Sequence, residues 1–142
     1  MKIKAGLDNA VFKFVEHELY NYEDTKKELR DLKDDIAESS ISNMKLDNFS
    51  STKKHPKGSN TETAVIIILQ NKVAKRMSST IKYIDRAINE LEEEKAILYI
   101  LKYRRGKSWQ QIIQILNVSQ ATYFRWRKDI VKKVAEKMGL WQ

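Results

Sequence analysis

The chain of 142 residues contains no cysteine and two histidines, His17 and His55. Without cysteine the protein forms no disulfide, no thiolate-bound zinc or iron–sulfur centre, and has no thiol nucleophile. The two histidines lie far apart in the sequence, which does not match the spacing of a histidine metal site. We therefore expect no metal, no cofactor and no catalytic residue, and a binding protein rather than an enzyme.

Glycine and proline are also scarce, with four and one residues. This composition favours long helices and argues against a turn-rich β fold or a Gly-rich phosphate loop. The longest purely apolar run, residues 64–69, is far shorter than the roughly 20 residues that span a bilayer. The first 17 residues contain no apolar stretch like that of a signal peptide. We therefore expect a cytoplasmic protein with no membrane partner.

Positive charge is concentrated at one end of the chain. The net charge is +8. Residues 1–40 carry 7 basic and 10 acidic side chains, whereas residues 93–142 carry 11 basic and 4 acidic ones. A concentrated positive field attracts polyanions and speeds their association. The basic end is therefore a candidate nucleic-acid surface, and the alternative is a basic surface that only keeps the protein in solution.

Helical periodicity predicts an all-α fold in which a helical N-terminal part and a long central helix precede a C-terminal helix-turn-helix. Asn and Asp at residues 21–24 favour caps and turns, so they break the first part in two. A stretch rich in Ser that also holds the only Pro indicates a linker. We divide the chain into an N-terminal helical segment at 1–40, a polar linker at 41–60, a long central helix at 61–92 and a DNA-binding domain at 93–142.

The central helix carries an apolar stripe along one face. Ser59 and Glu62 have capping-box spacing at its start, and no helix breaker follows before Leu91. About thirty helical residues extend roughly 45 Å, which outruns a small core. We therefore predict a homo-oligomer that forms through this stripe. The residues predicted to lie in the contact are Ile66, Val73, Met77, Ile81, Ile84 and Ile88.

The last fifty residues predict three helices with two defined junctions. The helix at 93–103 ends before Gly106, a residue suited to a left-handed helix stop. Ser108 and Gln111 have capping-box spacing and begin a short second helix. Asn117 tolerates the left-handed backbone of a tight turn, and Ser119 caps a third helix at 120–138. This order of helix, tight turn and helix is typical of a helix-turn-helix, whose second helix enters the DNA major groove.

The third helix sorts by angle into an inner and an outer side. Tyr123, Trp126, Ile130 and Val134 are predicted to face the core, and Arg127 points partly inward but extends to solvent. On the outer side the small Ala121 permits close approach, and the cations reach phosphates or guanine edges. Gln120 is placed to pair with adenine, and Phe124 either touches a thymine methyl or completes the core. The full predicted DNA-binding set is Ser108, Ser119, Gln120, Ala121, Thr122, Phe124, Arg125, Lys128 and Lys132, with Arg104, Arg105 and Lys107 before the second helix.

The C-terminal third resembles the fourth conserved region of bacterial sigma-70 factors, the module that binds the promoter −35 element. The resemblance covers about residues 91–136. Three positions depart from that pattern, since Asn117 stands in place of the usual Gly, Ile113 in place of a small residue and Tyr123 in place of a common Val. The matching positions are residues 91–95, 97–98, 101–103, 108–112 and 116–119, with Thr122 and Arg125.

The whole chain also resembles phage late-gene transcriptional regulators of the RinA/ArpU type. The resemblance rests on residues 15–22, on residues 26–29 with Leu32 and Ile36, on the polar linker and on a long helix that begins near Thr61. It implies an activator of phage packaging and morphogenesis genes in the bacterial host, associated with the nucleoid. Its implied partners are double-stranded promoter DNA and host RNA polymerase.

Other functions remain as alternatives. One is a phage small terminase subunit that binds a packaging site, although in those proteins the DNA-binding module usually comes first. Another is an adaptor that engages RNA polymerase through the sigma-like module. Tyr20 and Tyr22 are either half-buried helix ends or anchors for a partner. The sequence does not decide whether residues 61–103 form one helix or two.

Overall fold

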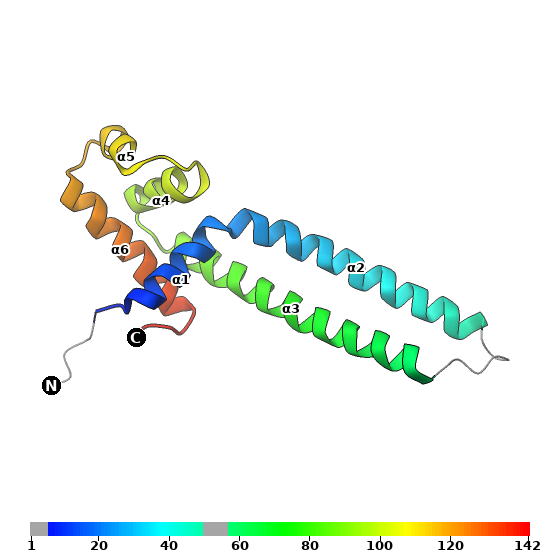
Figure 1. Cartoon of the computed structure of the whole chain (residues 1–142). Coiled ribbons are helices and arrows are strands. Elements are labelled where there is room, and N and C mark those ends of the chain that lie inside the picture. The colour runs from blue at the N-terminus through cyan, green and yellow to red at the C-terminus, as the bar shows by residue number, and fades with distance from the viewer. Residues whose placement is uncertain (1–5, 50–56) are drawn as a thin grey trace. The chain divides into compact units, whose positions relative to one another are not determined.

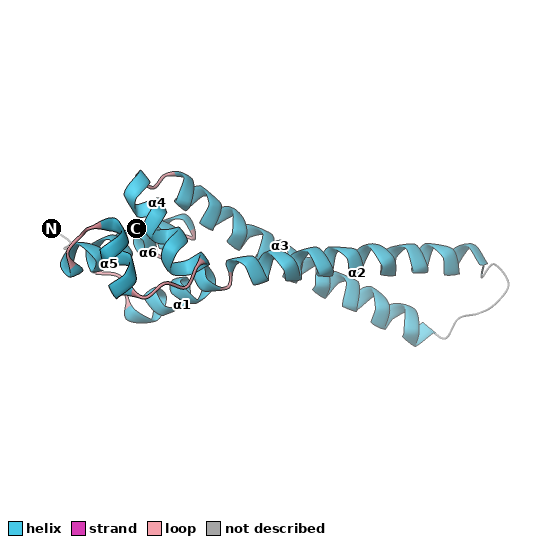
Figure 2. Cartoon of the chain, turned by 90° about the horizontal axis from the view of Figure 1, so that it is seen from above, coloured by secondary structure: helices cyan, strands magenta, loops and turns pink. Residues whose placement is uncertain are grey.

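The computed structural model describes the backbone of residues 6–49 and 57–142, and the side chains of residues 6–41 and 61–142. Helices make up its ordered elements and no strand occurs in these ranges, which confirms the all-α prediction (Figures 1 and 2). No described helix is both long and apolar enough to cross a membrane. The elements are α1 (Asn9–Tyr20), α2 (Tyr22–Phe49), α3 (Lys57–Asn89), α4 (Glu93–Tyr99), η1 (Ile100–Arg104), α5 (Trp109–Leu116) and α6 (Gln120–Lys137).

The predicted break near residues 21–24 is confirmed, and it is one residue long. Asp8 caps the start of α1 by accepting from the Ala10 N–H at 3.2 Å. At the other end, the Asn21 N–H donates to the His17 carbonyl at 3.0 Å, and α2 starts at the next residue. Glu23 and Asp24 lie in the first turn of α2, where acidic side chains complement the helix dipole.

The segment predicted as a linker at 41–60 is helical over residues 41–49 and 57–60. α2 continues to Phe49, and α3 begins at Lys57, two residues before the predicted cap at Ser59. Residues 41–49 contain neither Gly nor Pro, and Ser and Asn lower helix propensity by well under 1 kcal/mol each. A polar composition therefore does not stop this helix. The single proline, Pro56, lies outside the described residues.

Residues 6–22 and 80–142 form one compact unit, so α1 belongs with the C-terminal helices. α1 packs on α6, and α4 packs on both α5 and α6. The core joins residues of α1, the end of α3 and the three C-terminal helices. Its largest fully buried side chains are Tyr99, Tyr123, Leu19, Ile84, Leu98, Ile112 and Ile130.

The helix predicted at 93–103 changes type within its length. Its first part is α4, and the second is the π-helical turn η1, which closes with a hydrogen bond from the Arg105 N–H to the Ile100 carbonyl at 2.9 Å. The Lys107 N–H then returns to the Leu101 carbonyl at 2.9 Å across Gly106, whose φ is +64°. This closure confirms the predicted left-handed stop at Gly106.

α3 ends at Asn89 and α4 starts at Glu93, so residues 61–103 form separate helices. Between them Glu90 pairs with Lys137 at 2.7 Å and with Lys133 at 3.3 Å. These contacts hold the end of α3 against α6.

Residues 23–49 and 57–79 form the second unit. It contains most of α2 and α3, which run in opposite directions (Figure 1). Among the side chains described in this unit, Leu29 of α2 and Ala74 of α3 are the buried apolar ones. A core of this size buries little apolar surface, and several large apolar side chains of α3 stay exposed.

Candidate nucleic-acid interface

The predicted pair of helices with a tight turn is present as α5 and α6. The Ser108 Oγ accepts from the Gln111 N–H at 3.2 Å, and the Gln111 Oε1 accepts from the Ser108 N–H at 3.1 Å, which completes the capping box. Asn117 adopts the left-handed backbone with φ of 53°. Ser119 caps α6 by accepting from the Thr122 N–H at 3.1 Å. Both caps and the turn are therefore confirmed.

The inner side of α6 is close to its prediction. Tyr123, Ile130 and Val134 are buried. Trp126 is only half-buried and packs against the edge of the core. Val131 and Ala135 are also buried, because α1 covers the side of α6 on which they lie. The helical spacing of residues within α6 does not predict that Val131 and Ala135 are buried.

Arg127 does not extend to solvent, so that prediction is wrong. Its Nε donates to the Glu16 carboxylate of α1 at 3.0 Å, and its Nη2 forms a second short bond to the same group. The side chains of Arg127 and Glu16 are 28% and 13% exposed. The guanidinium also lies 4.9 Å from the centre of the Phe12 ring. Arg127 thus fastens α1 to α6, with an acid partner 111 residues away in the sequence.

The Glu16 carboxylate is the electrostatic centre of this junction. It also accepts from the Tyr103 hydroxyl at 2.6 Å. Burial alone raises the pKa of Glu16, but the hydrogen bonds from Arg127 and Tyr103 and the Arg127 charge outweigh it and hold this pKa below its ordinary value. Burial and the bond to Glu16 raise the pKa of Tyr103. The carboxylate is therefore ionised at neutral pH and holds Arg127 in place.

The outer side of α6 is open at its N-terminal half. We call Gln120, Ala121, Arg125 and Lys128 the α6 outer face, and all four are exposed. Ala121, Arg125 and Lys128 follow one another at helical spacing along one line of the helix. Residues 117–128 contain no Asp or Glu. This half of the helix therefore presents a small residue, an amide and two cations with no acid among them.

Other predicted DNA-binding residues are engaged within the chain. Lys132 is half-buried, and its ammonium lies 5.4 Å from the centre of the Trp141 ring. The prediction that Lys132 points toward solvent or DNA is therefore wrong. The Arg104 guanidinium lies 4.7 Å from the Tyr22 ring and 5.5 Å from the Tyr99 ring. Ser108, Ser119 and Thr122 stay at the surface but use their polar atoms for capping, including a Ser119–Thr122 hydroxyl bond of 2.9 Å.

Most cations of the last fifty residues are held by partners. Besides Arg104, Arg127 and Lys132, these are Lys95 with Asp129 at 3.2 Å, Lys133 and Lys137 with Glu90, and Lys102. The Lys102 ammonium lies 5.5, 5.3 and 6.0 Å from the rings of Tyr20, Tyr103 and Tyr123. The remaining four make no ion pair or ring contact with any described residue. These four, the open cations, are Arg105, Lys107, Arg125 and Lys128.

The two tyrosines of the first helix junction differ in placement. Tyr22 is buried, and its hydroxyl donates a short hydrogen bond to Asp85. Tyr20 is 49% exposed, and its ring meets the Tyr103 ring at 4.8 Å. Both side chains therefore pack within this unit, as half-buried helix ends do.

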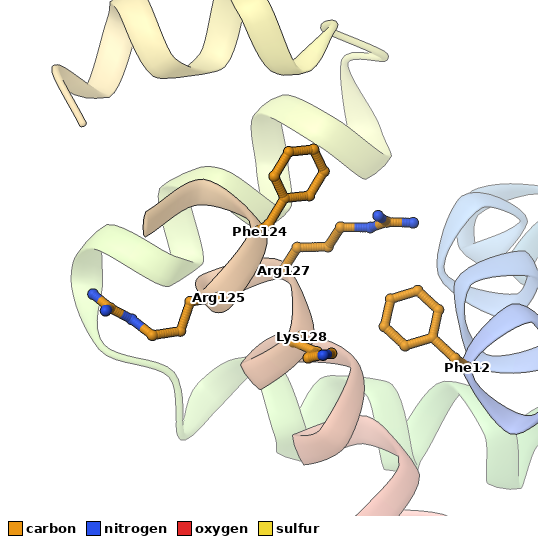
Figure 3. A pocket seen from close by; sticks show the side chains of 5 residues that line it. All are labelled: Phe12, Phe124, Arg125, Arg127 and Lys128. Carbon is orange, nitrogen blue, oxygen red and sulfur yellow. The ribbon is translucent and has the colours of Figure 1, made fainter. Parts of the chain in front are cut away.

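Phe124 lies between the core and the surface. It is 39% exposed, and its ring packs 5.0 Å from Tyr123 and 6.1 Å from Trp109. Beside it is an open pocket of about 380 Å³ between α1 and α6, lined by Phe12, Phe124, Arg125, Arg127 and Lys128 (Figure 3). In Figure 3 Arg127 extends toward the side of Phe12, whereas the Arg125 guanidinium points to the opposite side. Phe12 and Glu16 were missed from the sequence because no local pattern links α1 to α6.

The predicted oligomerisation residues divide into two groups. Ile84 is buried in the core, so its predicted role in an oligomer contact is wrong. Ile81 and Ile88 are half-buried and pack against the same core. Met77 is half-buried. Ile66 and Val73 are 54% and 45% exposed. Val65 and Leu69 are exposed on the same side of α3, and with Ile66 and Val73 they form what we call the α3 stripe.

No curated protein and no solved structure matches this chain. One family model does match, over residues 19–136, and its description is "Protein of unknown function (DUF722)". The match includes α2 to α5 and nearly all of α6, and it begins after Phe12 and Glu16. Because it covers well over half of the sequence, the chain belongs to the DUF722 family.

Proposed function

We propose that this protein binds specific DNA sequences through α6 and regulates transcription, without acting as an enzyme. The observation that carries the proposal is the position of the open cations. Arg125 and Lys128 lie on the α6 outer face, and Arg105 and Lys107 lie in the loop that leads into α5. In a helix-turn-helix the second helix meets base edges, and the residues around it meet phosphates.

The chemistry of the α6 outer face suits the major groove. Ala121 adds little bulk at the point of closest approach. Arg125 follows one turn later, and its guanidinium matches the O6 and N7 acceptors of guanine. Gln120 supplies an amide that pairs with adenine. Lys128, a further turn along, reaches the backbone as a point charge.

The biological role rests on the resemblance to RinA/ArpU regulators, and we propose an activator of phage or prophage late genes. The proposed DNA-binding helices α5 and α6 follow the long helices α2 and α3, an order that favours a regulator over a small terminase subunit. Contact with host RNA polymerase is part of this proposal.

A second copy of the chain is the proposed occupant of the α3 stripe. Ile66, Leu69 and Val73 are spaced by three and four residues, which is the spacing of a coiled-coil seam. Full burial of an exposed side chain of this kind stabilises by about 1.5–3 kcal/mol. Each stripe residue is already about half buried, so burying the rest contributes about half of that. Four residues on each of two copies therefore contribute about 6–12 kcal/mol, which is comparable to the association cost of about 4–15 kcal/mol. A dimer also suits two-fold symmetric DNA sites.

The test is selection of bound sequences from a random duplex pool with the full chain, followed by footprinting of the recovered site with and without RNA polymerase. We expect one recovered motif and a footprint without polymerase. The Arg125→Ala variant should bind that site about 5- to 150-fold more weakly, with little change on scrambled DNA. Absence of any enriched sequence overturns specific binding, and a footprint that requires polymerase favours the adaptor alternative.

A further inference from the structure

The pocket between α1 and α6 has the chemistry of a site for an anion that carries an apolar group. Its two Phe rings form apolar walls, and its lining includes two cations without an ion pair to any described residue, Arg125 and Lys128. The Arg125 guanidinium points away from Phe12, so Lys128 is the open cation that remains for a ligand here (Figure 3). Arg127 is neutralised by Glu16, so it stiffens the wall and leaves Lys128 to bind a charge. No acidic side chain lines the pocket.

The position of the pocket restricts what can fill it. Phe124 and Lys128 lie on α6 at the edge of the outer face, and Phe12 comes from the helix that flanks α6. The major groove is about 12 Å wide and a helix with its side chains is about 10–12 Å across. A recognition helix therefore fills the groove, and an element beside it meets the sugar-phosphate strand that borders the groove.

We propose that α1 takes part in DNA contact, with one phosphate bound by Lys128 and the adjoining deoxyribose packed against Phe12 and Phe124. This inference rests on the proposed function of α6. It assigns a DNA-contacting role to the N-terminal helix, which lies outside the helix-turn-helix. The Arg125 guanidinium points away from Phe12, so it remains available for a base edge while Lys128 holds the strand (Figure 3).

The Glu16–Arg127 pair prepares this site before DNA arrives. Arg127 lies over the Phe12 ring at 4.9 Å and is itself fixed by two bonds to Glu16. Phe12 is thereby half-buried and held toward α6. A contact residue that is already ordered loses less conformational entropy on binding.

The first experiment measures the affinity of variants of the whole chain for the recovered DNA site at salt concentrations from about 50 to 200 mM. Counterion release changes the affinity measurably over this range. Lys128→Gln should make the log–log salt slope shallower by about one. Phe12→Leu should weaken binding by about three- to tenfold with an unchanged slope, because no charge is lost. Phe14→Leu is the matched control, since Phe14 is 50% exposed on the same helix and does not line the pocket.

The second experiment uses the absence of cysteine in the chain. The Phe12→Cys and Phe14→Cys variants each carry one thiol. Each is mixed with the site duplex bearing, on single backbone phosphates, a tether that ends in a mixed disulfide with a small thiol, so that attack by the protein thiolate forms the new disulfide and releases the small thiol. We expect Phe12→Cys to form a disulfide at one or two phosphates at least tenfold faster than Phe14→Cys. This trap gives an answer even where Phe12→Leu lowers stability.

The outcomes separate the two levels of the proposal. If the wild-type chain selects no DNA, the proposed function fails and this inference fails with it. If the wild-type chain binds its site but Phe12→Leu binds equally well and both thiols trap at equal rates, α6 binds DNA without α1 and this inference alone is wrong. A Phe12→Leu effect on polymerase binding but not on DNA binding likewise overturns it in favour of a protein ligand.

Discussion

The contact between Glu16 and Arg127 gives the sharpest test of the fold, because it joins the first helix to the last. Replacing Arg127 by Ala leaves a carboxylate that is 13% exposed with the Tyr103 hydroxyl as its remaining partner. Removing one partner of a buried pair costs about 3–5 kcal/mol. Arg127 is itself 28% exposed, so we expect the lower end, about 3 kcal/mol. For a chain of this length that corresponds to a melting temperature lower by about 10 °C.

The assay is thermal and urea unfolding of Arg127→Ala beside two further variants. Arg125→Ala is the matched control, because it makes the same substitution two residues earlier, at an open cation. We expect it to lower the free energy of unfolding by less than about 0.5 kcal/mol. The double variant Glu16→Leu with Arg127→Met should recover most of the loss, because apolar residues of similar volume replace both charges. If Arg127→Ala melts with the wild type, or if Arg125→Ala loses as much, α1 does not pack on α6 as described.

Four further outcomes follow from the structure. Asn117→Val should lower the unfolding free energy by about 1–2 kcal/mol and Asn117→Gly should not, because only the former resists a φ of 53°; equal melting temperatures would contradict the left-handed turn. Ser119→Ala should cost about 0.5–2 kcal/mol in urea unfolding through the lost cap of α6, and a cost of zero would count against that cap. Leu69→Glu should yield a folded monomer by circular dichroism and light scattering, whereas Ile84→Glu should unfold; a dimer retained in Leu69→Glu rejects the α3 stripe as the contact. The pKa of Glu16 is lower in the folded state, so its stabilisation is full above the ordinary value of 4.5 and is lost as the pH falls through the folded-state pKa; Glu16→Gln should flatten that acid limb, and an unchanged limb would show that other carboxylates govern it.

Local patterns predicted the C-terminal helices well because local chemistry decides their ends. Ser108 and Ser119 cap the helices that follow them, and Gly106 and Asn117 take the positive φ expected of them. Such features depend on a few neighbouring residues. They are therefore visible in the sequence without knowledge of the tertiary fold.

Contacts between distant segments were not predicted. Arg127 was placed partly inward by the helical wheel, but nothing local names Glu16, 111 residues away, as its partner. Helical spacing marks the apolar stripe of the central helix as one surface, although its last part enters the core of one unit and its first part stays exposed. Periodicity shows that a face is apolar and does not show which partner covers it.

The candidate DNA-binding surface contains fewer cations than the sequence predicts. Charge counting over the last fifty residues suggested a broad basic surface, but Glu16, Glu90, Asp129 and several aromatic rings hold most of those cations. What remains open is the loop before α5 and the outer face of α6. Net charge alone does not distinguish an engaged cation from an available one.

The central claim is that the open cations bind DNA phosphates and bases, and the salt dependence of DNA binding tests it most directly. With four open cations in each copy, the slope of log affinity against log salt should be about −4 per bound copy. Changing Arg105, Lys107, Arg125 and Lys128 together to Gln should bring this slope near zero. The control changes Lys27, Lys33, Lys72 and Lys75 to Gln, which removes the same charge from exposed positions of the other unit and should leave the slope unchanged. A near-zero slope for the wild-type chain, or equal losses in the two fourfold variants, would contradict DNA binding through α6.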